Sequence, residues 1–186
     1  HAGCCPKRQS RTGAFGRLSR QHVLKLLREY RMKITVISVG KLKEKYLIQG
    51  IPEYQKRLSR FCDLELIEVS DEKAPETLSA AQELQVKQKE GERIKKKLKD
   101  DSVIIVLDVK GQKLSSVELA EKLNSYFITG SSHITFIIGG SLGLDPEITA
   151  VADFRLSISD MTFPHQLCRL ILLEQIYRAF KIINGE

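Results

Sequence analysis

The chain has 186 residues and a formal net charge of +7, which at first suggests a polyanionic partner. The net positive charge comes entirely from residues 1–31, which contain eight Lys and Arg and one acidic residue. Residues 32–186 carry 22 basic and 22 acidic residues and are balanced. The composition therefore excludes a broadly basic RNA-binding domain, and any affinity for RNA must come from local patches or a composite surface. No apolar stretch approaches the length of a membrane span.

Residues 1–31 lack the apolar run of a signal peptide, and Met32 opens a clear strand pattern. We interpret 1–31 as a basic leader outside the folded domain, disordered or derived from sequence upstream of the natural start. A targeting presequence and a basic RNA-binding arm remain alternatives, because the segment is rich in Arg and poor in acids. Residues 32–186 are long enough for one domain with its own core.

Cysteines occur at positions 4, 5, 62 and 168, with no C-x-x-C pair and no histidine at metal-ligand spacing. We therefore expect no metal site. Free thiols in a reducing, cytoplasmic environment are the simplest expectation for the two cysteines of the main domain.

In the first half of this domain, strand patterns alternate with helix patterns. They predict a strand over 32–39 ending at Gly40, a charged helix to about 60, a strand over 64–69, a loop over 71–75 and a long charged helix over 79–99.

The second half contains two nearly continuous apolar runs, 103–109 and 134–138, typical of strands buried on both faces of a parallel sheet. Gly111 predicts a turn between the first run and a helix that Ser115 or Ser116 caps. That helix is expected to end near 128, and a strand over 154–158 and a helix from Pro164 to about 183 complete the chain. The pattern predicts an α/β fold with a Rossmann-like, five-stranded, mainly parallel sheet and helices on both faces.

In such a sheet, ligands bind beyond the carboxyl ends of the strands, which brings residues 107–109, 139–143 and 159–163 to one rim. Glycines after a buried strand let backbone amides approach a ligand closely. A tight turn without a ligand explains the Gly-Gly-x-x-Gly run equally well. The Gly-Lys-Ser/Thr ending of a triphosphate loop and the G-x-G-x-x-G fingerprint are both missing, so neither nucleotide hydrolysis nor hydride transfer is favoured.

Several motifs in fixed order resemble the RlmH family of bacterial methyltransferases, which belong to the SPOUT class. They are Met32-Lys-Ile-Thr-Val, Val39-Gly-Lys-Leu-Lys43, Ile67-Glu-Val69, Lys89-Glu-Gly91, Phe136-Ile-Ile-Gly-Gly-Ser-Leu-Gly143, Leu156-Ser, Met161-Thr-Phe-Pro-His165 and Leu172-Leu-Glu-Gln-Ile-Tyr-Arg-Ala-Phe-Lys181. The resemblance covers nearly all of 32–186 and excludes the leader.

This resemblance implies a C-terminal part threaded through a trefoil knot and a homodimer without metal or membrane. It further implies that S-adenosyl-L-methionine is used to methylate N3 of a pseudouridine in 23S rRNA. The balanced charge of 32–186 fits a target within the assembled ribosome, where the ribosome's own walls help to position the enzyme. The knot rests on the resemblance alone, because knotted chains are rare.

By the same resemblance, the cofactor site lies on the rim identified above. Its predicted residues are Leu107, Gly139, Gly140, Ile158, Ser159, Asp160, Met161, Thr162 and Phe163. We expect apolar side chains among them to enclose the adenine and backbone groups to supply the hydrogen bonds.

The predicted catalytic residues are His165, Glu174 and Arg178. His165 is a candidate proton acceptor or ligand contact, although a histidine at a helix start also serves as a structural hydrogen-bonding group. Arg169 and Arg178 are candidates for binding RNA phosphate or the cofactor carboxylate, with Glu174 orienting them. Glu174 and Arg178 fit a simple i,i+4 ion pair equally well.

The sequence departs from the family pattern at its end, because family members continue past Asn184-Gly185-Glu186 into a Tyr-His pair and a basic residue. We therefore expect normal cofactor binding but poor turnover. Two other classes stay open: a non-catalytic RNA-binding or ribosome-assembly factor, and, with less support, a small-molecule enzyme such as a nucleotide-dependent dehydrogenase.

Overall fold

The computed structural model describes residues 31–73 and 77–186. Its single sheet has the strand order β2-β1-β4-β3-β5, and every neighbouring pair is parallel. The strands are β1 (Met32–Val39), β2 (Cys62–Val69), β3 (Val103–Lys113), β4 (His133–Ile138) and β5 (Phe154–Ser157). The leader up to residue 30 and part of the loop predicted over 71–75 lie outside the described residues.

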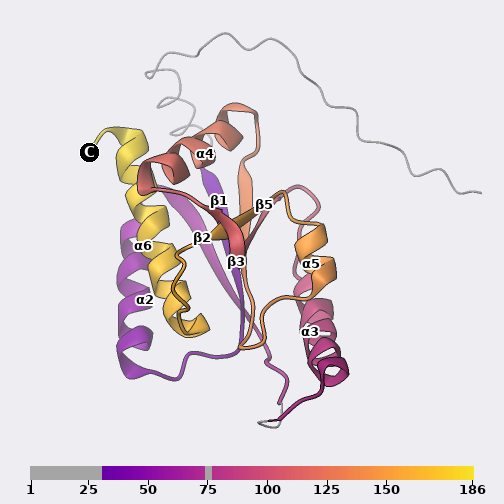
Figure 1. The fold of residues 1–186 in the computed structure, drawn as a ribbon. Helices are drawn as coiled ribbons and strands as arrows, with labels where there is room; N and C mark the ends of the chain where they lie inside the picture. The colour runs from indigo at the N-terminus through magenta and orange to yellow at the C-terminus, as the bar shows by residue number, and fades with distance from the viewer. Residues whose placement is uncertain (1–30, 74–76) are drawn as a thin grey trace, which may run out of the picture.

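Helices cover both faces of this sheet (Figure 1). They are α2 (Lys45–Leu58), α3 (Ala80–Lys95), α4 (Ser116–Ile128), α5 (Pro146–Ala150) and α6 (His165–Asn184). Helix α6 packs against both α2 and α4, whereas α3 packs against α5 on the opposite face. The predicted α/β class, the five strands and the helices on both faces are confirmed.

Two apolar clusters fill the space between the sheet and its helices. Ile34 and Val36 of β1 belong to the larger cluster, which includes Leu173 of α6. Ile37 and Val39 of the same strand belong to the smaller one, which includes Ile94 of α3. Successive strand residues point to opposite faces, so a continuous apolar run serves both clusters.

Serine caps fix the starts of two helices. Ser79 and Gln82 form a capping box at α3, and Ser115 and Glu118 form one at α4. Each pair satisfies two backbone N–H groups that would otherwise lack partners. Ser115 is thus the cap of α4. Helix α3 ends at Lys95 rather than near 99.

The predicted turn at Gly111 is wrong, because β3 continues through it to Lys113. The pairing of β3 with β5 shifts between Leu107 and Gln112, both of which align with Leu156. A Cβ on Gly111 would lie 2.7 Å from the carbonyl carbon and oxygen of Arg155. Glycine therefore permits close approach of two strands at a bulge rather than a chain reversal.

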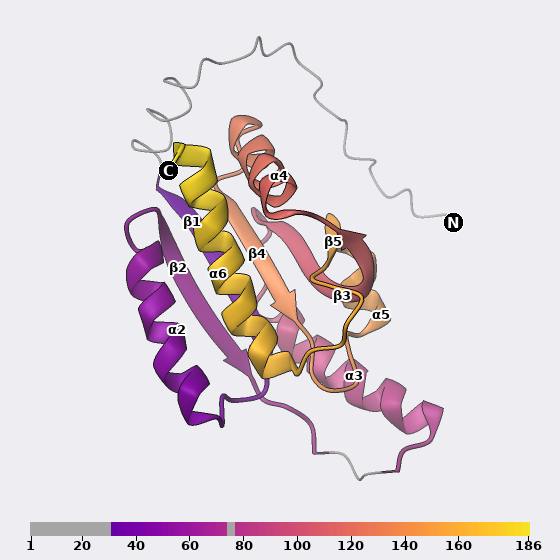
Figure 2. The same cartoon turned by 60° about the vertical axis from the view of Figure 1, so that its left-hand side comes forward.

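The trefoil knot stays a prediction. The linker over 158–164 does lie against the end of β3, since Lys113 Nζ is 2.6 Å from Asp160 Oδ2. Figure 2 shows this linker, between β5 and α6, at the end of the sheet where the arrowheads of β2 and β4 lie.

Candidate functional site

The predicted rim consists of residues 107–109, 139–143 and 159–163. Because all strands of the sheet are parallel, the segments that follow β1 and β2 lie at the same edge. Residues 107–109 belong to β3 and not to a loop, which corrects one of the three predicted segments. The other two, 139–143 and 159–163, are connections as predicted.

The segment after β4 folds back on itself. Gly140 and Gly143 form an isolated bridge, with a 3.1 Å hydrogen bond from the Gly143 amide to the Gly140 carbonyl. Gly143 has φ of 91°, and a Cβ on Gly139 would lie 2.9 Å from the Gly143 carbonyl carbon. The tight turn is therefore present, and its glycines are needed for the turn itself. Ligand binding by Gly139 and Gly140 stays a prediction.

The linker after β5 is held by short polar contacts. Ser157 Oγ donates to the Ser159 carbonyl at 3.1 Å, and the Met161 amide donates to Ser159 Oγ at 3.0 Å. Among the described residues, the amides of Asp160, Thr162 and Phe163 find no acceptor. These amides are available to a ligand.

Two of the three rim segments expose an apolar side chain. Met161 is 70% exposed and Val109 is 67% exposed, more than any other large apolar side chain of the described chain. Leu107 is partly buried and packs against the larger core cluster instead. Ile158 and Phe163 are also partly buried. Free amides beside exposed apolar side chains fit a ligand with an apolar ring system and polar edges.

The structure also contains a small cavity, and Arg169 is the one candidate site residue that lines it. Its lining is Val36, Ser38, Leu42, Ile51, Leu66, Glu68, Arg169 and Leu173. It lies between β1, β2, α2 and α6, so we do not assign it to the cofactor.

His165 opens α6 at the rim. Its Nε2 lies 3.7 Å from the position that a Cβ on Gly40 would occupy, beside the side chain of Asp71. Burial, followed by the positive charge of Arg169, lowers the pKa of His165, and Asp71 opposes this effect. A neutral imidazole is the form that accepts a proton.

Glu174 and Arg178 lie elsewhere on the same helix. Arg178 Nε donates to Glu174 Oε1 at 2.9 Å, and the Arg178 side chain is 54% exposed. Arg178 is 13 residues beyond His165, a rise of roughly 20 Å along α6. One copy of the chain therefore does not bring these two residues to His165, and their catalytic role stays a prediction.

Arg169, a candidate phosphate or carboxylate ligand, is buried and occupied. Its guanidinium donates to the carbonyls of Val39 and Gly40 at 2.7 and 2.6 Å, and to Glu68 Oε1 at 2.8 Å. Burial lowers the pKa of Arg169, with Glu68 opposing. This arginine fastens α6 to the ends of β1 and β2, a role that its helical position did not reveal.

Sequence reasoning also missed Glu90. It is a carboxylate only 5% exposed that lies against the Gly139–Gly140 turn. The only sequence signal was a Glu followed by a Gly inside a charged helix, at Lys89-Glu-Gly91.

Within residues 31–73 and 77–186, no three His, Cys, Asp or Glu side chains gather as metal ligands would. None of the helices in that part of the chain is both long and apolar enough to cross a bilayer. The two described cysteines carry free thiols, and burial raises the pKa of the Cys62 thiol to about 12.

A family model described as predicted SPOUT methyltransferase matches residues 32–186, the whole of the described domain. The chain is 66% identical over 155 residues to the ribosomal RNA large subunit methyltransferase H of Acetivibrio thermocellus, a match covering 83% of this chain and 98% of the relative. The chain belongs to the RlmH family of SPOUT methyltransferases.

Further RlmH relatives match over the same length. The ribosomal RNA large subunit methyltransferases H of Ruminiclostridium cellulolyticum and Bifidobacterium adolescentis are each 59% identical, again over 83% of this chain and 98% of theirs. A solved structure described as a probable methylase family protein from Haemophilus influenzae has a TM-score of 0.46 at 16% identity, covering 83% of this chain and 68% of that one. That similarity is too weak to bear on the site.

Proposed function

We propose that this chain transfers a methyl group from S-adenosyl-L-methionine to N3 of a pseudouridine in 23S rRNA of the assembled ribosome, working in the cytoplasm as a homodimer. The observation that carries the proposal is its membership of the RlmH family over 32–186, supported by relatives named for methylation of large-subunit ribosomal RNA. The balanced charge of 32–186 favours a substrate that the ribosome helps to position.

We assign the cofactor to the rim. The free amides of Asp160, Thr162 and Phe163 would bind its polar groups, and Met161 would cover its apolar ring. Leu107, Gly139, Gly140, Ile158 and Ser159 complete the proposed site. The bound cofactor would supply a methyl group on a sulfonium cation, which requires no metal.

The chain's own residues must meet the other requirements of methyl transfer. Displacement at a methyl carbon needs the nucleophile in line and the N3 proton removed, so positioning supplies much of the rate. We propose that the neutral imidazole of His165 accepts that proton or contacts the substrate. Glu174 and Arg178 would act in the same step only if a second copy of the chain brought them to the rim.

The homodimer is proposed with the family function. In the described chain, large apolar side chains are exposed on several elements, among them Tyr46 and Ile48 of α2, Val109 of β3 and Met161 of the linker after β5. Exposed apolar surface of this kind is available to a partner.

Titration calorimetry with S-adenosyl-L-methionine tests the proposal against a non-catalytic RNA-binding factor with the same fold. We expect saturable binding that weakens when Met161 is replaced by Glu, because a carboxylate would then stand where the ring is expected to pack. No heat of binding at any practical concentration would refute the cofactor assignment.

A further inference from the structure

Helix α3 supports the turn after β4 at two adjacent positions. Glu90 Oε2 lies 3.0 Å from the point that a Cβ on Gly140 would occupy, and Val39 Cγ1 lies 3.2 Å from it. A Cβ on Gly91 would collide with the buried side chain of Asp145, which caps α5. One turn of α3 therefore fixes both ends of the connection 139–145.

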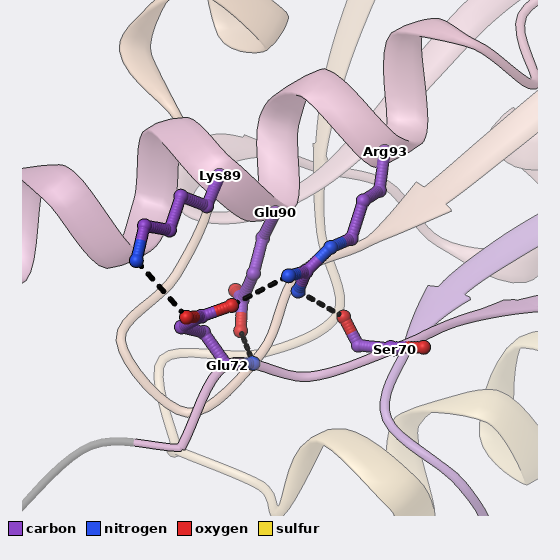
Figure 3. Close-up of polar contacts among 5 residues, drawn as sticks. All are labelled: Ser70, Glu72, Lys89, Glu90 and Arg93. Carbon is purple, nitrogen blue, oxygen red and sulfur yellow. Dashed lines mark hydrogen bonds and ion pairs between the residues drawn. The ribbon is translucent and has the colours of Figure 1, made fainter.

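The same glutamate is fastened to the segment after β2 (Figure 3). Its Oε1 accepts the Glu72 amide at 3.0 Å. The Glu72 side chain pairs with Lys89 at 3.1 Å and with Arg93 at 2.5 Å, and Arg93 also donates to the Ser70 carbonyl at 2.8 Å. Glu90 is thus the link between the segments that follow β2 and β4.

If Glu90 served only to fill space, its buried carboxyl group would reduce the stability of the folded state. Burial raises the pKa of Glu90, and the charges of Asp71 and Glu72 add to this, while the Glu72 amide and Arg93 oppose it. An apolar side chain of similar size would fill the space without the cost of burying a charge. Buried ionisable groups with shifted titration concentrate at functional sites.

We propose that Glu90 is a positioning residue for methyl-donor binding. Glu90 holds the Gly140 backbone against the end of β1 and links it to Glu72. In this way Glu90 fixes the position of the Gly139–Gly140 turn relative to the other rim segments. The inference rests on the proposed cofactor site and adds a residue that does not itself touch the donor.

The test compares the affinity of the full chain for S-adenosyl-L-methionine among substitutions at position 90. Glu90→Ala is expected to weaken binding about tenfold or more, because it leaves the partly buried Glu72 amide without its acceptor and the turn without support. Glu90→Gln is expected to bind within about threefold of the natural chain, because the amide oxygen accepts the same N–H and fills the same space.

Glu90→Asp keeps the charge but shortens the side chain, so this variant should bind S-adenosyl-L-methionine as weakly as Glu90→Ala does. If the alanine variant does not fold, Glu90→Asp takes its place in the test. Glu72→Ala is the matched control: it removes the ion pairs with Lys89 and Arg93 but keeps the amide that Glu90 binds. It should stay within about twofold of the natural chain.

A second arm tests the contact with Gly140 directly. Gly140→Ala should weaken binding clearly more in the natural chain than when Glu90 is already Ala, since the Glu90 oxygen that its methyl group would meet is then gone and only the contact with Val39 Cγ1 remains. Equal losses in both backgrounds would show that the contact plays no part.

The outcomes separate the two claims. If the unsubstituted chain binds no S-adenosyl-L-methionine, the proposed function is wrong and the role of Glu90 with it. If it binds, and Glu90→Ala lowers the melting temperature while leaving the affinity of the folded protein unchanged, Glu90 is structural and only this inference is overturned.

Discussion

Arg169 and Glu68 form an ion pair that joins the final helix to the end of β2, with Nη1 2.8 Å from Oε1. The arginine side chain is 5% exposed and the glutamate 40% exposed, so the pair stands at the edge of the buried region. The other Nη of Arg169 donates to two carbonyls at the end of β1. A single guanidinium therefore fixes α6 against the rim where His165 begins.

Arg169→Ala should lower the free energy of unfolding by about 2–4 kcal/mol, because it leaves the carbonyls of Val39 and Gly40 without their donor. Urea unfolding at one fixed protein concentration measures the change. Arg178→Ala, which breaks the exposed pair with Glu174, is the control and should have far less effect. Equal losses of stability in the two variants would contradict the role of Arg169 in holding α6 to the ends of β1 and β2.

Two glycine substitutions should change stability in opposite directions. Gly50 lies inside α2, where a Cβ would make ordinary contact with Leu170 at 3.4 and 3.5 Å. Gly50→Ala should stabilise the protein by about 0.5–1 kcal/mol. Gly111→Ala should cost roughly 1–3 kcal/mol, because its Cβ would meet the β5 backbone. Thermal melts of the two variants measure both changes in stability. A stabilising Gly111→Ala would refute the bulge geometry.

The lowered pKa of His165 makes stability depend on pH. The unfolded chain takes up a proton near pH 6.5, before the folded one does, so this residue's contribution to stability falls as pH drops through that value. The free energy of unfolding should therefore decline more steeply from pH 8 to pH 6 in the natural chain than in His165→Gln. Parallel profiles would show that the imidazole is not shielded as the structure indicates.

Single-turnover methylation separates the predicted catalytic residues. His165→Ala should slow the chemical step by about 100-fold or more if the imidazole accepts the proton, with cofactor affinity largely kept. Arg178→Ala should slow it only if a second copy brings the residue to the rim. An unchanged rate for either variant removes that residue from the mechanism.

The sheet could be predicted because its signal is local. Continuous apolar runs at 103–109 and 134–138 indicated buried parallel strands, and the structure has β3 and β4 there. The turn expected at Gly111 failed because the partner that explains this glycine, the backbone of Arg155 and Leu156, lies more than 40 residues away in the sequence.

The candidate site was predictable as a set of segments but not as a set of contacts. The Gly-Gly run and the linker after β5 were assigned to one rim by the rule for parallel sheets, and both follow strands at that end. Arg169 looked like a possible ligand because its acceptors are 101 to 130 residues away in the sequence. The Lys89-Glu-Gly91 run did not reveal the role of Glu90, since that role depends on a glycine, Gly140, that is distant in the sequence and close in space.

The most direct test of the proposed function is transfer of a labelled methyl group from S-adenosyl-L-methionine to ribosomes from a strain lacking the modification, followed by mapping of the labelled base. The account predicts label at N3 of a single pseudouridine in 23S rRNA, with assembled ribosomes labelled in strong preference to naked RNA. Label on another base or on a small molecule, or none with a chain that binds the cofactor, would contradict it.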